Sequence, residues 1–289
     1  MAIRANINGR MCTEAEAVVS VFDHGFLYGE GVYETLRTYR RKPFLFDRHL
    51  RRLRASASMI DLDVPLTGDC LLARMEETAA DLNAEGEIYF RILLTRGPGD
   101  FCYDLNACPE PTLVIIARPF APPPEEVYAR GIRVSVVSTT RSYPNSINPL
   151  IKSNNLLPNA LAMREARKRG AYEGVMVNFR GEITECSQSN FFVVEQGQVL
   201  TPPLESGLLA GITRELVLEI SAEAQLSTRE CVLRVRDLLD ADEAFLTSTT
   251  REVVPIVRVD GHVIGSGQPG PITRMLLDRF RTKALELSS

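Results

Sequence analysis

One proline-rich stretch limits how this chain can fold, because it divides the predicted strands and helices into two groups. Residues 117–126 read Ala-Arg-Pro-Phe-Ala-Pro-Pro-Pro-Glu-Glu, between two segments with the alternation of strands. Closely spaced prolines favour an extended, stiff connection. We therefore expect a small N-terminal α/β domain over residues 1–118, an interdomain linker over 119–130, and a larger C-terminal domain over 131–289.

Several short strands joined by tight turns are predicted on both sides of this linker. Asn8-Gly9 predicts a hairpin near residues 3–12, and Arg180-Gly181 predicts another turn. Helices are expected at about 48–59, with Asp47 as cap, and at 68–82, 158–169, 213–224 and 271–287. Strands are expected at 31–39, 88–96, 112–117, 132–139, 175–178, 182–184, 191–195 and 243–247. Hairpins among helices predict an α+β fold rather than a doubly wound parallel sheet.

The composition excludes several classes of function. The 289 residues are 45% hydrophobic and 24% charged, with a formal net charge of −4, which argues against nucleic acid as the main partner. No apolar run is long enough to predict a membrane span. The six cysteines form no C-x-x-C pair and the three histidines are widely spaced, so no metal site is expected. Scattered thiols predict a reduced, cytoplasmic protein.

Lys152 is the residue that most strongly indicates chemistry. Only four of the 33 basic residues are lysine, and Lys152 is the one charged residue between Arg141 and Arg164. Arginine serves as well as lysine on most solvated surfaces, but only an amine can lose its proton and act as a nucleophile near neutral pH. Lys152 is therefore a candidate Schiff-base lysine, although a lysine extending from a loop edge into water would look the same in isolation.

A cofactor such as pyridoxal phosphate would also need an acid for its ring nitrogen and a cradle for its phosphate. Glu185 is the candidate acid, and we expect it on a polar turn between apolar strands. Gly211-Ile212-Thr213 opens an apolar helix, whose free amides favour an anion. The hydroxyl cluster Thr247–Thr250 and Arg48 are further candidates. Each candidate has a simpler alternative. Glu185 could be a solvated glutamate and Thr213 a helix cap, while the hydroxyl cluster could form a turn and Arg48 could be a surface arginine.

Taken in order, these segments resemble the class IV aminotransferases, the family of branched-chain and D-amino-acid aminotransferases that use pyridoxal 5′-phosphate. The resemblance covers nearly the whole chain. Its motifs are Tyr28–Glu34, Asp47–Leu53, Tyr89-Phe90-Arg91, Ile151-Lys152-Ser153, Glu185 with Asn190 and Phe192, Leu209–Arg214, and Ser248-Thr249-Thr250 with Glu252. It implies two α/β domains with the cofactor between them.

The resemblance also implies roles for individual residues. Lys152 is similar to the catalytic lysine, and Glu185 to the partner of the pyridine nitrogen. The implied phosphate ligands are Arg48, Ile212, Thr213, Ser248 and Thr249, and Leu209 would pack on the ring. The implied substrate pocket contains Tyr33, Tyr89, Arg91 and Thr250.

The residues carry features of two different subfamilies. Tyr89-x-Arg91 is similar to branched-chain enzymes, in which the arginine binds the distal carboxylate of glutamate. Leu156 stands where those enzymes often carry a tyrosine, which favours D-amino-acid transaminases. The latter, however, carry an Arg-x-His carboxylate trap after Thr-Arg-Gly, and no histidine follows Thr95-Arg96-Gly97 here.

We therefore expect a transaminase that moves an amino group from an amino acid, preferably branched-chain, to a 2-oxo acid such as 2-oxoglutarate. The alternatives are a D-amino-acid or (R)-amine transaminase, an aminodeoxychorismate lyase, and a non-catalytic binding protein. The partners expected are small amino acids and 2-oxo acids, with no nucleic acid and no membrane. A homodimer or higher homo-oligomer is expected because the family completes its pocket with a loop of a partner subunit.

Overall fold

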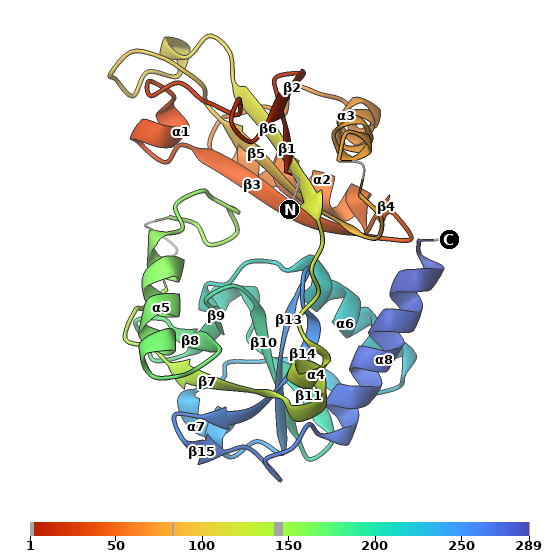
Figure 1. Ribbon diagram of the computed structural model, residues 1–289. Helices are drawn as coiled ribbons and strands as arrows, with labels where there is room; N and C mark the ends of the chain where they lie inside the picture. The colour runs from red at the N-terminus through yellow and green to blue at the C-terminus, as the bar shows by residue number, and fades with distance from the viewer. Residues whose placement is uncertain (1–2, 83, 142–146, 289) are drawn as a thin grey trace. The chain divides into compact units, whose positions relative to one another are not determined.

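The computed structural model describes residues 3–82, 84–141 and 147–288, which form two compact units. The first unit is Met1–Ala121 with Ile151–Asn155 and Leu285–Ser289, and the second is Pro122–Leu150 with Leu156–Ala284. Each unit is built around one sheet (Figure 1). The short segment that carries Lys152 therefore belongs with the N-terminal part of the chain. The predicted domain limits of 118 and 131 remain a prediction.

The first unit is an antiparallel sheet in the order β2-β1-β6-β5-β3-β4, with two main helices. Its strands are β1 (Arg4–Ile7), β2 (Arg10–Thr13), β3 (Gly31–Tyr39), β4 (Lys42–Pro43), β5 (Ile88–Thr95) and β6 (Thr112–Pro119). Its helices are α1 (His24–Leu27), α2 (Phe46–Ser58), α3 (Gly68–Ala80) and the short 3₁₀ helix η1 (Leu105–Ala107).

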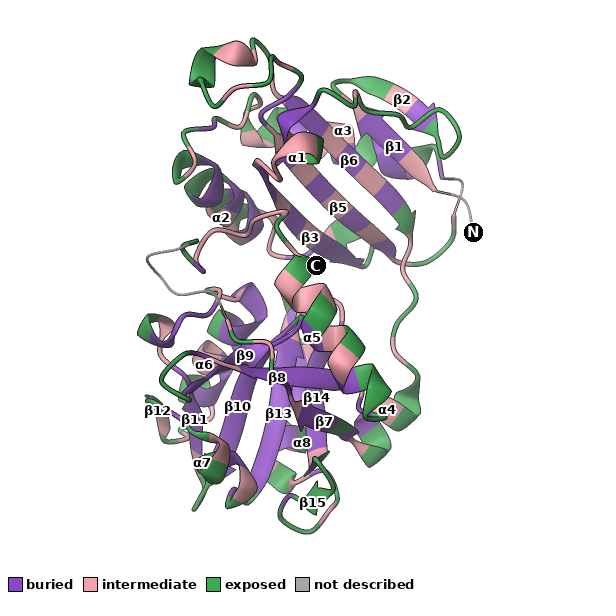
Figure 2. Ribbon diagram, turned by 90° about the vertical axis from the view of Figure 1, so that its left-hand side faces the viewer, coloured by how far each residue is buried: buried purple, intermediate pink, exposed green. Residues whose placement is uncertain are grey.

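The two faces of this sheet differ. Residues of β5 alternate strictly between buried and half-buried, and Figure 2 shows a similar alternation over the middle of β6. The buried residues, such as Phe90 and Ile92, share one core with Leu50 and Leu53 of α2 and with Leu71 of α3. Since side chains alternate between the faces of a strand, the half-buried residues lie on the face opposite this core.

The second unit has a mixed sheet in the order β12-β11-β10-β13-β14-β7-β8-β9, with β15 paired to β14. Its strands are β7 (Ile132–Val136), β8 (Glu173–Val177), β9 (Ile183–Cys186), β10 (Asn190–Glu195), β11 (Gln198–Thr201), β12 (Thr228–Glu230), β13 (Glu243–Ser248), β14 (Glu252–Val259) and β15 (His262–Val263). Its helices are α4 (Glu125–Arg130), α5 (Leu157–Lys168), η2 (Leu204–Ser206), α6 (Ile212–Glu223), α7 (Val235–Leu239) and α8 (Pro271–Glu286).

The α+β prediction is confirmed, and the predicted helices are found within a few residues of their expected ends. Three local predictions are wrong. Asp47 lies inside the first turn of α2, and Leu45 with φ 52° is the cap. The supposed linker contains α4, because Pro124 is compatible with a helix start and Glu125 and Glu126 suit its first turn. Glu185 lies within β9 and is buried, rather than on a polar turn.

Candidate active site

Lys152 lies in an irregular segment that pairs with the first residues of β3. Its carbonyl accepts a hydrogen bond from the Tyr33 amide at 2.9 Å, and its own amide donates to Ser56 Oγ of α2 at 3.1 Å. An isolated antiparallel bridge joins Val32 to Ser153, and the Asn154 amide donates to the Gly31 carbonyl at 3.0 Å. These bonds to a sheet edge and a helix hold the lysine backbone in place although it is in no helix or strand.

The Lys152 side chain ends at an aromatic ring on the sheet face opposite the core. Its Nζ lies 4.6 Å from the centre of the Tyr33 ring, and Arg91 Cζ lies 4.2 Å from the same centre. Tyr33 and Arg91 are both half-buried, and their strands pair with Tyr33 opposite Leu93 and Thr35 opposite Arg91. Tyr89 shares this face two residues along β5, where Arg118 lies 4.6 Å from its ring. The structure thus brings together Lys152, Tyr33 and Arg91, with Tyr89 on the same face.

A buried charged network lies on the opposite side of β3. Glu34 accepts from His49 Nδ1 at 2.7 Å, from Arg52 Nε at 2.7 Å and from Arg52 Nη2 at 2.9 Å, and its side chain is fully buried. Burial alone would raise the pKa of Glu34, but the Arg52 guanidinium and His49 more than offset this and lower it. Burial lowers the pKa of His49, although Glu34 opposes the effect.

Sequence reasoning assigned no role to this network. Its only signal was an acidic residue at a position where the alternation of β3 requires a buried side chain, which predicts a basic partner. Arg48, the predicted phosphate ligand, is half-buried in the first turn of α2 beside His49. It belongs to the same unit as Lys152, whereas the remaining phosphate candidates belong to the second unit.

In the second unit, both oxygens of the buried Glu185 have partners. Oε1 lies 2.9 Å from Arg141 Nη2, and Oε2 accepts from the Leu209 amide at 3.1 Å. The Leu209 carbonyl in turn accepts from the Asn190 side-chain amide at 2.9 Å. Glu185 and Leu209, both predicted from the sequence, are therefore in direct contact. Arg141 and Asn190 complete this cluster, and the sequence had suggested no contact for either of them.

The N-terminus of α6 lies directly after this cluster. Gly211 is its cap and offers no side chain, so the amides of Ile212 and Thr213 have no partner inside the helix. A Cβ at Gly211 would lie 1.8 Å from Asn190 Oδ1, which explains the glycine by close approach rather than by an unusual backbone angle. The sequence-based alternative, Thr213 as a plain helix cap, is wrong, because Thr213 is the second helical residue.

The hydroxyl cluster follows the end of β13. Ser248 closes the strand opposite Glu252, and Thr249, Thr250 and Arg251 form the turn into β14. The side chains of Ser248, Thr249 and Thr250 are half-buried. Asn190 pairs with Thr247 in the sheet register, so the turn and the Glu185 cluster are held by neighbouring strands.

The donors in the second unit suit the phosphate of pyridoxal 5′-phosphate. Two helix amides, the Thr213 hydroxyl, and the hydroxyls of Ser248 and Thr249 are all groups that hydrogen-bond a phosphate oxygen. The carboxylate of Glu185 suits a protonated ring nitrogen, and Lys152 is the one predicted site residue with an amine. Each part of the cofactor thus has a chemically suitable partner among these residues.

The described residues include neither a membrane-spanning helix nor a candidate metal site. No helix among them is long and apolar enough to cross a membrane. No group of three or more His, Cys, Asp or Glu residues described by the structure is placed to hold a metal ion.

Comparisons with known proteins place most of the chain in one family. The model of a family described as amino-transferase class IV matches residues 31–259. A Methanocaldococcus jannaschii protein, provisionally named branched-chain-amino-acid aminotransferase, is 38% identical over 95% of this chain and 94% of its own. The D-alanine aminotransferase of Bacillus licheniformis is 33% identical over 92% of each chain. The crystal structure of a Thermoproteus uzoniensis branched-chain aminotransferase with norvaline is 32% identical and has a TM-score of 0.92, covering 100% of this chain and 97% of that one.

Proposed function

The chain belongs to the class IV aminotransferases and is a pyridoxal 5′-phosphate-dependent enzyme, and from this premise we propose that it transfers the amino group of branched-chain amino acids to 2-oxoglutarate. The observation that carries the proposal is the placement of Lys152. Its backbone is bonded to β3 and α2, and its amine rests on the ring of Tyr33 beside Arg91.

When bound, the cofactor withdraws electrons from the substrate Cα through its protonated pyridine ring. Lys152 would hold the cofactor covalently, and its amine would act as the general acid–base that moves the proton at the substrate Cα. Glu185 would keep the ring nitrogen protonated, and Leu209, whose amide donates to Glu185, would pack on the ring face.

The phosphate ligands in this proposal are Arg48, the amides of Ile212 and Thr213, and the hydroxyls of Thr213, Ser248 and Thr249. An anion is favoured at the N-terminus of α6 because its free amides and its dipole point in the same direction. The proposed substrate-binding residues are Tyr33, Tyr89, Arg91 and Thr250. Among them, Arg91 is the cation that would bind the distal carboxylate of glutamate and 2-oxoglutarate.

The substrate assignment is tested with a donor panel. We expect L-leucine and L-glutamate to react and D-alanine and (R)-1-phenylethylamine to react poorly, with 2-oxoglutarate as a better acceptor than pyruvate. The second candidate is a D-amino-acid transaminase, which the Bacillus licheniformis relative and Leu156 favour. Rapid reaction of D-alanine with poor reaction of L-leucine would replace the first proposal by the second.

We also propose that the enzyme is a homodimer formed through an exposed apolar surface of the first unit. This surface consists of Val18, Val19, Val21, Phe22, Phe26, Phe101, Tyr103 and Leu105. Its two loops are side by side, because the Phe22 and Phe101 rings are 5.9 Å apart and the Gly99 amide donates to the Phe22 carbonyl. Large exposed apolar patches often mark an interface, and a two-fold symmetric homodimer uses the same patch on both subunits. Phe26→Asp with Phe101→Asp should yield monomers in sedimentation experiments.

Two further expectations remain part of the proposal. All six cysteines are free, which suits a reducing, cytoplasmic compartment. Residues 119–130 are proposed to connect the N-terminal and C-terminal domains, with α4 within the connection.

A further inference from the structure

A buried ion pair in the second unit lies outside the residues assigned above. Arg251 Nη1 lies 2.6 Å from Glu173 Oε2, and the two side chains are 11% and 0% exposed. Burial would lower the pKa of Arg251, but the Glu173 carboxylate more than offsets this and raises it. Burying two charges is costly unless their geometry and additional hydrogen bonds compensate, so the further bonds of the pair are informative.

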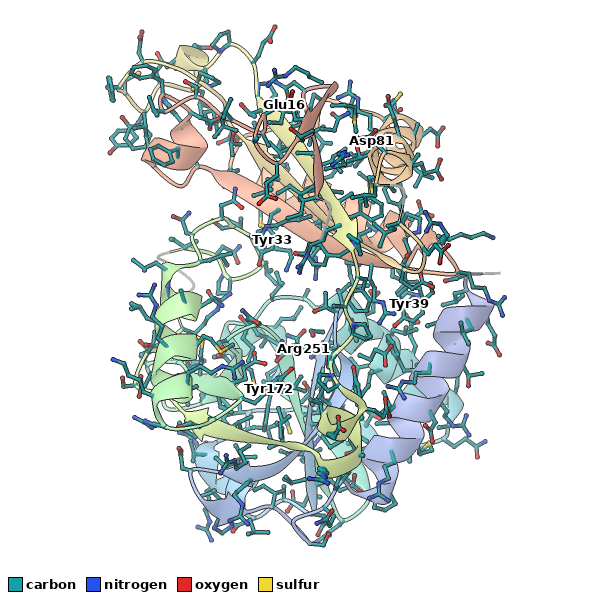
Figure 3. All side chains as sticks on the ribbon, viewed as in Figure 1. Glu16, Tyr33, Tyr39, Asp81, Tyr172 and Arg251 are labelled. Atoms are coloured by element: carbon teal, nitrogen blue, oxygen red, sulfur yellow. The ribbon has the colours of Figure 1, made fainter. Side chains whose placement is uncertain are left out.

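Each nitrogen of the Arg251 guanidinium has a different partner. Nη1 binds Glu173, Nη2 donates to the Gln188 carbonyl at 3.2 Å, and Nε donates to Ser248 Oγ at 3.1 Å. Ser248 is a proposed phosphate ligand, and Gln188 is in the loop that leads from β9, which carries Glu185, to β10. The Arg251 side chain therefore joins the turn that carries Ser248 to the loop between β9 and β10, which follows Glu185. The centre of the Tyr172 ring lies 5.9 Å from Arg251 Cζ, and both residues are labelled in Figure 3.

Glu173 holds the same loop from its other oxygen. Its Oε1 accepts from the Gln188 amide and from Ser189 Oγ at 3.0 Å. The Ser189 carbonyl in turn accepts from the Cys186 amide at 2.7 Å, directly after Glu185. The carboxylate and the guanidinium thus bind both the amide and the carbonyl of Gln188. The loop is held by a charged pair rather than by apolar packing alone.

The hydrogen bond from Arg251 also determines whether the Ser248 hydroxyl can donate its hydrogen to another group. A hydroxyl has one hydrogen and two lone pairs, and one lone pair of Ser248 Oγ is used by Arg251 Nε. Arg251 can only donate, so the Ser248 hydrogen must point elsewhere. Within the described ranges no acceptor takes that hydrogen, and Ser248 is half-buried. A hydroxyl held in this way is prepared to donate to an anion.

We propose that Glu173 and Arg251 are positioning residues that hold the Ser248 hydroxyl as a hydrogen-bond donor to the cofactor phosphate. This inference rests on the proposed role of Ser248 as a phosphate ligand. Lysine cannot replace Arg251 in this role, because its ammonium is a compact donor that lacks the planar fork reaching three separate acceptors.

The test compares two cofactors that differ only in the phosphate. Dissociation constants of pyridoxal 5′-phosphate and of unphosphorylated pyridoxal are measured by titrating the cofactor-free full-length enzyme. Arg251→Lys should weaken pyridoxal 5′-phosphate binding about tenfold, as expected for the loss of one well-oriented hydrogen bond, and should leave pyridoxal binding nearly unchanged. Ser248→Ala should have the same effect, and the double variant should be no weaker than either single variant.

Arg281→Lys is the matched control. Arg281 also forms an ion pair in this unit, with Glu252, the residue after Arg251, but it donates to no proposed cofactor ligand. It should change neither dissociation constant. Glu173→Gln is a second probe, because it keeps the size of the side chain and removes the charge that holds Arg251. It should weaken phosphate-dependent binding in the same selective way, with thermal unfolding reporting any loss of fold.

The outcomes separate this inference from the proposed function. Equal weakening of both cofactors by Arg251→Lys would mean a purely structural pair and would overturn the inference. Additive effects of Arg251→Lys and Ser248→Ala would also overturn it while leaving Ser248 as a phosphate ligand. If Ser248→Ala changed neither constant, both the inference and the proposed phosphate role of Ser248 would be rejected.

Discussion

Lys152 Nζ lies 4.6 Å from the centre of the Tyr33 ring, and the two residues are also joined by a backbone hydrogen bond of 2.9 Å. The amine and the ring face that receives it are thus held by the same contact between a sheet edge and an irregular segment. A cation over an aromatic ring is stabilised by about 0.5–2 kcal/mol, depending on its exposure. The Tyr33 ring therefore stabilises the Lys152 amine in this position, and the amine must leave the ring in order to react.

The first prediction concerns Lys152. Lys152→Ala should abolish covalent attachment of the cofactor and reduce turnover by orders of magnitude, because no other nucleophile replaces the amine. The fold should survive, since the backbone bonds of residue 152 do not involve its side chain. Borohydride reduction followed by peptide mapping identifies the modified lysine, with Lys168→Ala as the control. Attachment at Lys42, Lys168 or Lys283 would refute the assignment.

The second prediction concerns cofactor retention. Thr213→Ala and Arg48→Ala each remove a proposed phosphate contact, and hydrogen bonds to charged groups contribute about 1.5–3 kcal/mol. The dissociation constant of the cofactor should therefore rise on the order of ten- to hundredfold, while turnover at saturating cofactor falls much less. Equilibrium titration of each variant provides the measurement. Unchanged affinity in both variants would contradict the proposed cradle.

The third prediction concerns the close approach of Gly211 and Asn190. Gly211→Ala places a Cβ 1.8 Å from Asn190 Oδ1, and the overlap should cost about 1–3 kcal/mol of the free energy of unfolding. Asn190 holds the Leu209 carbonyl, so cofactor affinity should also fall. Gly68→Ala is the control, because its nearest contact is the flexible end of Leu50 at 2.9 Å.

A second change separates the steric overlap from other effects of Gly211→Ala. Adding Asn190→Ala removes the atom that the new Cβ meets, so the double variant should be less destabilised than the sum of the two single variants. Strict additivity, measured by thermal unfolding, would show that the overlap relaxes without involving Asn190.

The fourth prediction concerns pH. Burial lowers the pKa of His49 below its ordinary value of 6.5, so the unfolded chain takes up a proton near pH 6.5 that the native protein does not. The free energy of unfolding should therefore be greatest above pH 6.5 and fall as the pH drops below it, by up to about 1.4 kcal/mol per pH unit for this one proton. Glu34, whose pKa is also lowered, should add to the loss at lower pH.

His49→Gln removes this titration while keeping a polar side chain beside Glu34. The variant should be less stable than the wild type at pH 7.5, but its stability should change less between pH 7 and 5.5. Urea unfolding at several pH values gives both curves. If the wild type and the variant lost stability in parallel as the pH fell, protonation of His49 would not be coupled to unfolding.

The sequence was sufficient for elements whose pattern is local. The alternation of β5 and the apolar spacing of α3 and α6 predicted those elements within a few residues of their observed ends. Glu185 was misplaced because the sequence around it is polar, and its burial depends on Arg141 and the Leu209 amide, which are far along the chain. The linker helix was missed because the prolines before it dominate the local pattern.

Site residues with a distinctive side chain were recognisable from the sequence, whereas those that act through partners were not. Lys152 was conspicuous as a lone lysine, but nothing near residue 152 indicates that its segment borders β3. Glu173 and Arg251 are 78 positions apart and each looks like an ordinary surface charge in its own neighbourhood. Only the mixed sheet, which places β8 and the end of β13 within reach of one guanidinium, brings them together.

The last prediction concerns Arg91, which shares the Tyr33 ring with Lys152. If Arg91 binds the distal carboxylate of glutamate, Arg91→Ala should sharply raise the KM for 2-oxoglutarate, because a desolvated carboxylate without a partner costs several kcal/mol. The half-reactions of leucine and pyruvate should suffer much less, since an aliphatic side chain gains nothing from a cation. Single-turnover rates for each donor and acceptor, in wild type and variant, separate these effects. Equal losses for leucine and glutamate would instead place Arg91 at the shared α-carboxylate or in a structural role, and the branched-chain proposal would lose its specific support.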